Sequence, residues 1–200
     1  MKIEDKKLRI GIDIDDVLVA FIGGYLSFHN KKHNTNFNLE DVTNYHLWEC
    51  GIHKSREEDI LEVLEFQNST DFENLSLIEG ARNGLEKIAN RYKIYLISSR
   101  PEEVKERTRS YFDFSFPKNG FEIIFSGEIY GGKLSKSEIC KNLEIPLIIE
   151  DNPNYSLNCA KEGIKVFLLD KPWNKNYKKH KNITKVKEWG EILEKLEIEK

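Results

Sequence analysis

Cysteine and long apolar runs are both scarce in this 200-residue chain. The three cysteines, Cys50, Cys140 and Cys159, form no Cys-x-x-Cys pair, which argues against a disulfide framework and against a cysteine zinc site. We expect them to be small buried side chains. The strongly apolar stretch nearest the start, residues 17–28, is shorter than the about 20 residues of a membrane span, and aspartates rather than a basic segment precede it. We therefore expect a cytoplasmic protein with no membrane contact.

A large net charge is lacking as well. The 31 basic and 34 acidic residues leave a net charge of −3, so the chain has no overall basic field for a nucleic acid polymer. Aromatic residues make up 11% of the chain, and with charges this closely balanced the composition excludes a disordered chain. The length fits one domain, or one domain that carries a small insertion.

Short apolar runs predict β-strands at residues 8–13, 92–97, 121–125, 146–150 and 164–169. Runs of this kind, rich in β-branched residues, fit strands that are buried on both faces of a parallel sheet. Helical patterns alternate with them at residues 81–91, 101–112, 135–143 and 153–163, and a last helix is expected around residues 189–196. The alternation predicts an α/β fold with right-handed crossovers and helices on both faces of a parallel sheet.

Residues 19–77 interrupt this alternation because they contain no convincing strand. Helical patterns are present there, including a capping box from Ser55 to Glu58, together with many aromatic residues. A structureless loop of this length is improbable in a compact domain. We therefore predict a small helical module inserted after the first strand, with residues 1–18 and 78–200 forming the core domain.

Two other features are expected to lie at the surface. His29 and His33 are four residues apart, a spacing that places two side chains on one face of a helix, but no carboxylate on that helix completes a metal-binding pattern. The lysine-rich residues 171–187 are expected to form a solvated face.

Polar side chains follow the predicted strands at the points where the strands end. The carboxyl ends of parallel strands meet at one edge of a sheet, where ligands bind in open α/β folds. Carboxylates there suit Mg²⁺, and hydroxyl and ammonium groups suit phosphate. The side chains at these ends are Asp13, Asp15 and Asp16, then Ser98, Ser99 and Arg100, then Glu150, Asp151 and Asn152, with Lys136 at the start of the helix before the fourth strand.

Asp13 and Asp15 are two residues apart, so an extended backbone points both carboxylates to the same side. One of them can attack a phosphorus atom, and the other can protonate the leaving oxygen. An Asp-x-Asp pair alone also fits a metal–nucleotide site in a glycosyltransferase, or a turn. A receiver-like module that accepts phosphate on an aspartate is a further alternative. The position of the Asp-x-Asp pair after a buried strand, ahead of Val17 and Leu18, favours phosphoryl transfer over these alternatives.

These four motifs, in this order over residues 8–170, resemble those of the haloacid dehalogenase (HAD) superfamily of phosphatases. The resemblance implies a Rossmann-like core, an Asp13 nucleophile and Asp15 as general acid and base. It implies a Mg²⁺ ion held by the Asp13 carboxylate, the Asp15 main-chain carbonyl and Asp151, with Glu150 as the companion of Asp151.

The same resemblance implies a hydroxyl and a cation that hold the phosphoryl oxygens. Ser98 is preferred for the hydroxyl because it comes first off the strand, with Ser99 assisting. Lys136 is preferred over Lys133 for the cation because it lies in the first turn of a capped helix.

Within the superfamily, the chain looks similar to the 5′(3′)-deoxyribonucleotidase, or type C 5′-nucleotidase, branch. The similarity rests on the Asp-x-Asp-x-Val-Leu run ending at Phe21 and on residues 79–81, 99–101 and 170–174. It implies that residues 19–77 form a C1-type cap and that Phe21 packs against a nucleobase. Asp16 departs from this branch, where many members have glycine, and so does Glu150, where the mammalian enzymes have aspartate.

The expected function is therefore Mg²⁺-dependent hydrolysis of a phosphate monoester through an aspartyl-phosphate. The expected substrates are (deoxy)nucleoside monophosphates. The alternative is another small phosphate, such as a sugar phosphate or phosphoglycolate. A homodimer is compatible with the sequence.

Overall fold

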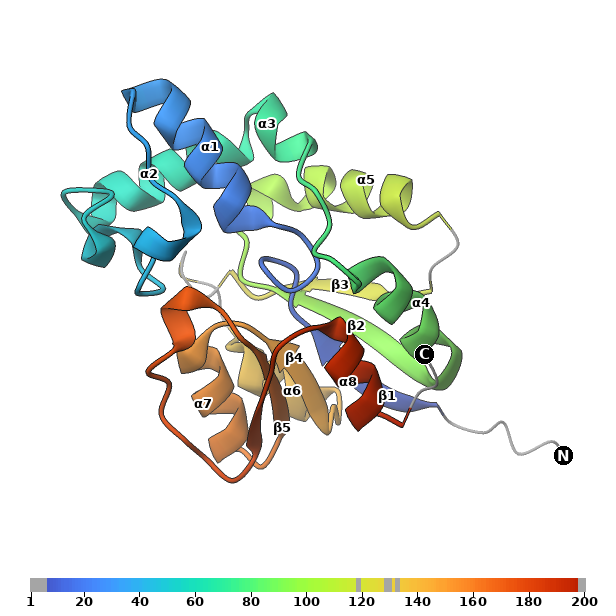
Figure 1. The fold of residues 1–200 in the computed structure, drawn as a ribbon. Helices are drawn as coiled ribbons and strands as arrows, with labels where there is room; N and C mark the ends of the chain where they lie inside the picture. Colours follow the sequence, from blue (N-terminus) through green and yellow to red (C-terminus); the bar gives the residue numbers. More distant parts are fainter. Residues whose placement is uncertain (1–6, 118–119, 128–130, 132–133, 198–200) are drawn as a thin grey trace, which may run out of the picture.

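A computed structural model describes residues 7–117, 120–127, 131 and 134–197 (Figure 1). Its sheet has six strands, all paired in parallel, in the order β3-β2-β1-β4-β5-β6. The strands are β1 (Leu8–Ile12), β2 (Tyr92–Ser98), β3 (Glu122–Phe125), β4 (Leu147–Glu150), β5 (Lys165–Leu169) and β6 (Ile183–Val186). The predicted parallel α/β fold is confirmed.

Strand β6 is the element that the sequence analysis missed. It lies inside residues 171–187, and the expectation that this whole stretch is a solvated face is wrong. Ile183 and Val186 are buried, and so are Trp173 and Asn174 further upstream. An edge strand pairs on one side only and is partly exposed, so it needs few apolar residues and tolerates lysines between them. Its sequence signal is therefore weak.

The strands separate two apolar layers, as their alternating side chains require. One layer contains Ile12, Leu96 and Ile149 and is covered by α4 (Ala81–Arg91), α5 (Lys105–Ser115) and α8 (Trp189–Lys195). The other contains Ile97, Ile148 and Val166 and is covered by α6 (Lys136–Asn142) and α7 (Pro153–Lys161). Burial on both faces explains the continuous apolar runs in the strands.

Trp189 ties the last helix to the loop that follows β1. Its indole N–H donates to the carbonyl oxygen of Val17 at 2.9 Å. Its ring packs on Gly84 of α4 so closely that a Cβ at that position would lie 2.2 Å from Trp189 Cε3. Only glycine allows this approach. Trp189 therefore packs against α4 and at the same time holds the loop after β1 through Val17.

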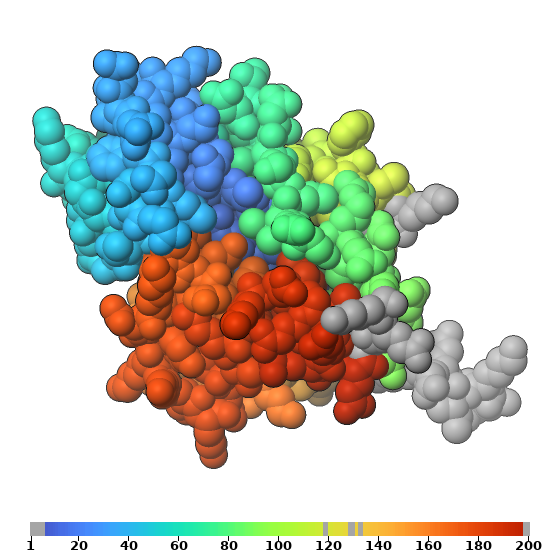
Figure 2. Space-filling model, viewed as in Figure 1, coloured from blue at the N-terminus to red at the C-terminus, as the bar shows by residue number. Residues whose placement is uncertain are grey.

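The segment between β1 and α4 forms a helical layer of its own, above the sheet in Figure 1. It contains α1 (Phe21–His33), α2 (Arg56–Gln67), α3 (Thr70–Glu73) and two 3₁₀ turns, Leu39–Asp41 and Leu47–Cys50. The two chain crossings into this layer lie side by side, because Val19 pairs antiparallel with Leu77. We call residues 19–77 the helical insert. Figure 2 shows it resting on the C-terminal half of the core.

The expectation that His29 and His33 form a surface pair is wrong for His29, which is 4% exposed. Its Nδ1 lies 2.6 Å from Glu62 Oε1. The carboxylate comes from α2 rather than from α1, a pairing across two helices that spacing along one helix cannot reveal.

The expectation of buried cysteines is confirmed for Cys140 and Cys159 but not for Cys50. Cys140 and Cys159 are buried, Cys50 is half-buried, and all three are free thiols. Among the described residues, the helices fall short of the length and apolarity that a membrane crossing requires.

Candidate active site

Asp13 stands where β1 ends, in the middle of the sheet. Its N–H donates to the carbonyl oxygen of Ile149 at 2.9 Å, so the neighbouring strand β4 fixes its backbone. The chain then makes one tight turn, in which the Leu18 N–H donates to the Ile14 carbonyl at 2.9 Å. The turn leaves Asp13 5% exposed, at the carboxyl edge of the strands.

Asp16 adopts a left-handed backbone conformation in this turn, with φ of 56°. Glycine adopts this region freely and aspartate tolerates it, which explains how Asp16 can stand where the resemblance leads one to expect glycine. The Asp16 carboxylate accepts the Ile22 N–H at 3.2 Å and so caps the start of α1. Burial raises its pKa to about 8.

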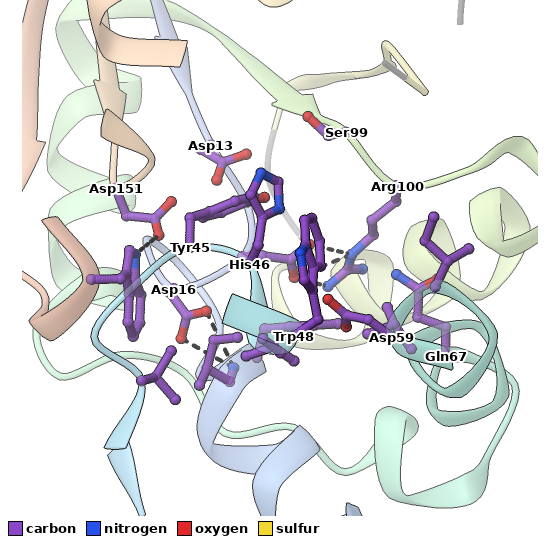
Figure 3. A pocket seen from close by; sticks show the side chains of 18 of the residues that line it. Asp13, Asp16, Tyr45, His46, Trp48, Asp59, Gln67, Ser99, Arg100 and Asp151 are labelled. Carbon is purple, nitrogen blue, oxygen red and sulfur yellow. Dashed lines mark hydrogen bonds and ion pairs between the residues drawn. The ribbon is translucent and has the colours of Figure 1, made fainter. Parts of the chain in front are cut away.

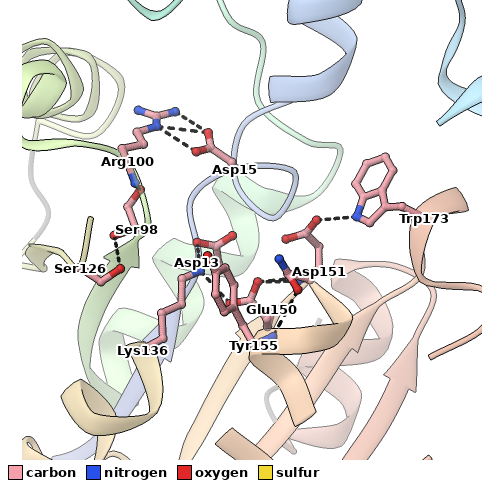
Figure 4. Close-up of polar contacts among 11 residues, drawn as sticks. Asp13, Asp15, Ser98, Arg100, Ser126, Lys136, Glu150, Asp151, Tyr155 and Trp173 are labelled. Atoms are coloured by element: carbon pink, nitrogen blue, oxygen red, sulfur yellow. Dashed lines mark hydrogen bonds and ion pairs between the residues drawn. The ribbon is translucent and has the colours of Figure 1, made fainter. Parts of the chain in front are cut away.

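Lys136 lies in the first turn of α6 and reaches the end of β1 (Figure 4). Its Nζ donates to Asp13 Oδ1 at 2.6 Å and to Glu150 Oε2 at 2.8 Å, and the residue is 2% exposed. Burial alone would lower the pKa of this ammonium, but the two carboxylates raise it well above its ordinary value. Lys136 is therefore a fixed positive charge. The alternative cation, Lys133, lies outside the described residues.

Asp13, Glu150 and Asp151 bring carboxylate oxygens within 4.8 Å of one another. Burial, followed by the charge of Glu150, raises the pKa of Asp13 to about 7. Burial and the charges of Glu150 and Asp13 raise the pKa of Asp151 well above its usual range. One lysine does not neutralise three buried carboxylates, and a divalent cation bound by oxygen ligands would do so. This donor set fits Mg²⁺.

Asp151 is held by two side chains from the segment after β5. Trp173 Nε1 donates to Asp151 Oδ2 at 2.8 Å, and Asn174 Nδ2 donates to the Asp151 main-chain oxygen at 2.8 Å. Glu150 turns the other way, and its Oε1 accepts the N–H groups of Asp151 and Asn152. These contacts orient Asp151 toward Asp13 (Figure 4). No spacing in the sequence could have paired Trp173 with Asp151.

The two serines at the end of β2 lie differently. Ser98 is fully buried, and its hydroxyl accepts the Arg100 N–H at 3.1 Å. Ser99 lines a cavity beside Asp13 and Lys136, and its buried hydroxyl has no hydrogen-bond partner among the described residues. A buried unpaired hydroxyl is costly unless a ligand completes it. Ser99 is thus the serine that offers a free donor to the cavity.

Arg100 holds Asp15, a contact that the sequence analysis did not foresee. Its Nη2 donates to Asp15 Oδ1 at 2.6 Å and its Nε to Oδ2 at 3.0 Å. The guanidinium also stacks 4.6 Å from the ring centroid of Phe72 in the helical insert. Asp15 is therefore drawn toward the insert and away from Lys136 (Figure 4).

The cavity opens between the strand ends and the helical insert (Figure 3). The insert contributes a rim of rings, Phe21, Tyr45, His46 and Trp48, in which His46 and Trp48 stack at 4.1 Å between ring centroids. The backbone N–H groups of Trp48 and Leu47 hydrogen-bond to Asp59 of α2, whose pKa burial raises to about 6. This rim faces the carboxylates across the cavity.

Two further residues from the insert complete the cavity wall. Gln67, at the end of α2, places its amide oxygen in the wall, buried and without a hydrogen-bond partner among the described residues. Phe21 lines the cavity as well, but it also packs edge-on against Phe66 at 5.4 Å and Phe72 at 6.4 Å. The cavity thus has carboxylates suited to a metal ion on the side of the strand ends, and aromatic rings on the side of the helical insert.

Comparison with known proteins agrees with this chemistry. A family model described as "5′ nucleotidase, deoxy (Pyrimidine), cytosolic type C protein" matches residues 6–198. A candidate nucleotidase of Bacillus subtilis, YqfW, is 27% identical over 94% of this chain and 92% of its own length. A nucleotidase of Clostridium acetobutylicum, CA_C3379, is 25% identical over 94% of this chain and 92% of its own length.

The fold is also similar to that of solved HAD-superfamily structures. The structure of a candidate HAD-hydrolase, YfnB of Bacillus subtilis, bound to magnesium, superposes with a TM-score of 0.64. It is 18% identical, and the match covers 96% of this chain and 100% of that one. With a family match that spans nearly the whole sequence, this chain belongs to the type C family of 5′-nucleotidases in the HAD superfamily, and it is a phosphate monoester hydrolase.

Proposed function

We propose that this protein is a Mg²⁺-dependent 5′-nucleotidase that hydrolyses (deoxy)nucleoside monophosphates through an aspartyl-phosphate on Asp13. One observation carries the proposal: four distant segments bring Asp13, Ser99, Lys136 and Asp151 to one cavity beneath an aromatic rim. Carboxylate, hydroxyl and ammonium groups are what phosphoryl transfer uses to attack, hold and neutralise a phosphate.

Asp13 is the nucleophile in this proposal. Its carboxylate oxygen forms a bond to phosphorus while the bond from phosphorus to the nucleoside oxygen breaks. Lys136, 2.6 Å from Asp13 Oδ1, fixes the carboxylate and favours its ionised form. The Ser99 hydroxyl donates to a phosphoryl oxygen, while Ser98 shapes the turn that presents it. When bound by Asp13, Asp151 and the Asp15 main-chain carbonyl, Mg²⁺ neutralises charge between the phosphate and the nucleophile.

Asp15 moves the protons. It gives a proton to the departing nucleoside oxygen, then takes one from the water that attacks the aspartyl-phosphate, which releases inorganic phosphate and regenerates Asp13. The ion pair with Arg100 holds the Asp15 carboxylate at the wall of the cavity.

The helical insert acts as a cap in this proposal. It closes the cavity from above and excludes water while the nucleoside oxygen departs. Its rings offer stacking surfaces for a base, and the unpartnered amide oxygen of Gln67 offers an acceptor for a donor group on the base or sugar. A simple sugar phosphate has no aromatic base to stack on the His46 and Trp48 rings.

Trp48→Ala tests the nucleotide assignment more cleanly than Phe21→Ala, because Phe21 also belongs to the core of the insert. Base stacking is worth about 1–3 kcal/mol, so kcat/KM for nucleoside monophosphates is expected to fall about 5- to 160-fold. The value for ribose 5-phosphate should change little. Initial rates of phosphate release give both numbers.

Phe114→Ala serves as the control for Trp48→Ala, because Phe114 is 90% exposed on α5. It should leave both kcat/KM values unchanged. A wild-type enzyme that turns over ribose 5-phosphate as well as nucleotides would remove the nucleotide assignment. That result would still agree with a phosphatase, but it would favour a sugar phosphate as the substrate.

Mg²⁺ is expected to stabilise the fold through Asp13 and Asp151. At about 100 times its Kd, a ligand of the native state adds about 2.7 kcal/mol to the free energy of unfolding. In a chain of this length that is a rise in Tm of about 5–10 °C over chelator-treated protein. Asp151→Asn should abolish the rise, and the exposed Asp113→Asn should keep it. A rise that survives in Asp151→Asn would contradict the assigned ligand set.

A further inference from the structure

A second group of metal-type side chains lies inside the helical insert, apart from the residues that line the cavity. Tyr25, His29 and His33 follow one another along one face of α1 at four-residue spacing. Glu62 of α2 and His53, just before α2, face them. Tyr25, His29, His53 and Glu62 are all buried, although each carries a polar group. The proposed reaction uses none of them.

Three of these side chains contact the two oxygens of Glu62, and His53 joins them through Tyr25. His29 Nδ1 lies 2.6 Å from Oε1, and His33 Nε2 lies 2.7 Å from Oε2. His53 Nε2 contacts the Tyr25 hydroxyl at 2.5 Å, and that hydroxyl lies 3.3 Å from Glu62 Oε1. Ligand atoms of His29, His53 and Glu62 all lie within 4.8 Å of one another.

This donor set is that of a transition-metal site rather than of a magnesium site. Imidazole nitrogen suits Zn²⁺ and its neighbours in the first transition row, whereas Mg²⁺ prefers oxygen ligands only. The imidazoles of His29 and His53 and the carboxylate of Glu62 supply three ligands of a tetrahedral zinc ion, and a water molecule can take the fourth position. The His-x-x-x-His spacing places His29 and His33 on one helix face, as in helical zinc sites.

His29 and Glu62 now lie at a hydrogen-bond distance, which is shorter than the distance between two ligands of one metal ion. Ligand atoms about 2.0–2.2 Å from a tetrahedral zinc ion are about 3.3 Å apart. The His29–Glu62 contact of 2.6 Å would therefore open by less than 1 Å, a side-chain adjustment, when a metal ion replaces the shared proton. The second nitrogen of each imidazole remains available for outer hydrogen bonds that orient the ring.

We propose that His29, His53 and Glu62 bind one divalent transition-metal ion of the zinc class, with Tyr25 in contact with His53 and His33 in contact with Glu62. The ion links α1 to α2 and to the turn that carries His53. Since α2 also carries Asp59 and Gln67 of the cavity wall, the ion holds the roof of the cavity in place. It stabilises the insert and takes no part in phosphoryl transfer.

Zinc retention measures this site directly. Chelator-stripped protein is given ZnCl₂, passed through a desalting column and analysed for metal by plasma mass spectrometry. Wild type and Asp151→Asn are both expected to keep about one zinc per chain, because Asp151→Asn disables only the carboxylate site. Glu62→Gln and His53→Ala should each keep at least about ten-fold less. His180→Ala, which removes a histidine outside the insert, should match wild type.

A Tm measurement keeps the proposal testable if a variant is weakened in the absence of metal. Zinc at about 100 times its Kd should raise the Tm of wild type by about 5–10 °C, and that of folded Glu62→Gln, checked by circular dichroism, by none. CoCl₂ should give wild type the visible absorption of a four-coordinate site. Zinc loss in Asp151→Asn with retention in Glu62→Gln would overturn the proposal, and so would no retention in wild type.

Discussion

Asp13→Asn is expected to lower kcat by about 10⁴-fold or more, the largest effect of any substitution proposed for this protein. The amide has the shape of the carboxylate and can still accept the hydrogen bond from Lys136, but it is too weak a nucleophile to form a bond to phosphorus. At 1.36 kcal/mol per factor of ten, the loss corresponds to about 5.4 kcal/mol of activation free energy. Phosphate release from an aryl phosphate with Mg²⁺ measures it.

The fold should survive this substitution. Lys136 keeps Glu150 at 2.8 Å as a charged partner, so Asp13→Asn leaves no unpaired buried charge. Asp113→Asn, on the exposed side of α5, makes the same chemical change away from the cavity and should keep wild-type kcat. Activity of Asp13→Asn within ten-fold of wild type would refute a nucleophilic role for Asp13.

Lys136→Met is expected to be the most destabilising of these substitutions. It removes the ammonium that pairs two buried carboxylates, and breaking a buried ion pair from one side typically costs about 3–5 kcal/mol. The free energy of unfolding, measured by urea denaturation of chelator-treated protein at pH 8, should fall by that amount. Activity should be lost as well, because Asp13 loses the charge that holds it.

The loss should depend on pH in a definite direction. Without Lys136, the pKa of Asp13 rises above the value of about 7 that it has beside the ammonium. A carboxyl whose pKa is higher in the folded state than the unfolded value of about 4 loses stabilising protonation as the pH rises between those two values. The difference between Lys136→Met and wild type should therefore be smaller at pH 5 than at pH 8.

Lys141→Met is the matched control, since Lys141 lies on the same helix and pairs with Glu162 at the surface. Its effect on stability should be small at both pH values, because exposed ion pairs contribute little. An equal loss in the two variants would mean that the burial of Lys136 between Asp13 and Glu150 has no energetic consequence.

The family match decides between the alternatives that the sequence left open. A receiver-like module and a glycosyltransferase do not apply to a chain that matches a 5′-nucleotidase family over residues 6–198. The cytoplasmic location, the homodimer and the choice between nucleotide and sugar phosphate stay predictions. Substrate choice depends on the shape of the insert, which motifs at the strand ends do not encode.

Local sequence patterns were enough to predict the sheet and the candidate residues at its edge. Five of the six strands were predicted, because strands buried on both faces must be apolar at successive positions, and such runs are local signals. Asp13, Lys136 and Asp151 were predicted together at one edge of the sheet for a similar reason, with Ser98 preferred over Ser99 as the hydroxyl. Parallel connectivity forces strand ends to a common edge, whatever the details of packing.

The packing of the folded chain sets which of these side chains are held by a neighbour and which keep an unpaired polar group. Arg100 binds Asp15, Trp173 binds Asp151, and Ser99 rather than Ser98 keeps an open hydroxyl. The buried histidines around Glu62 and the edge strand β6 belong to the same class of findings. Each depends on side chains that meet across different helices or strands, at distances set by packing rather than by position along the chain, so no spacing in the sequence could specify them.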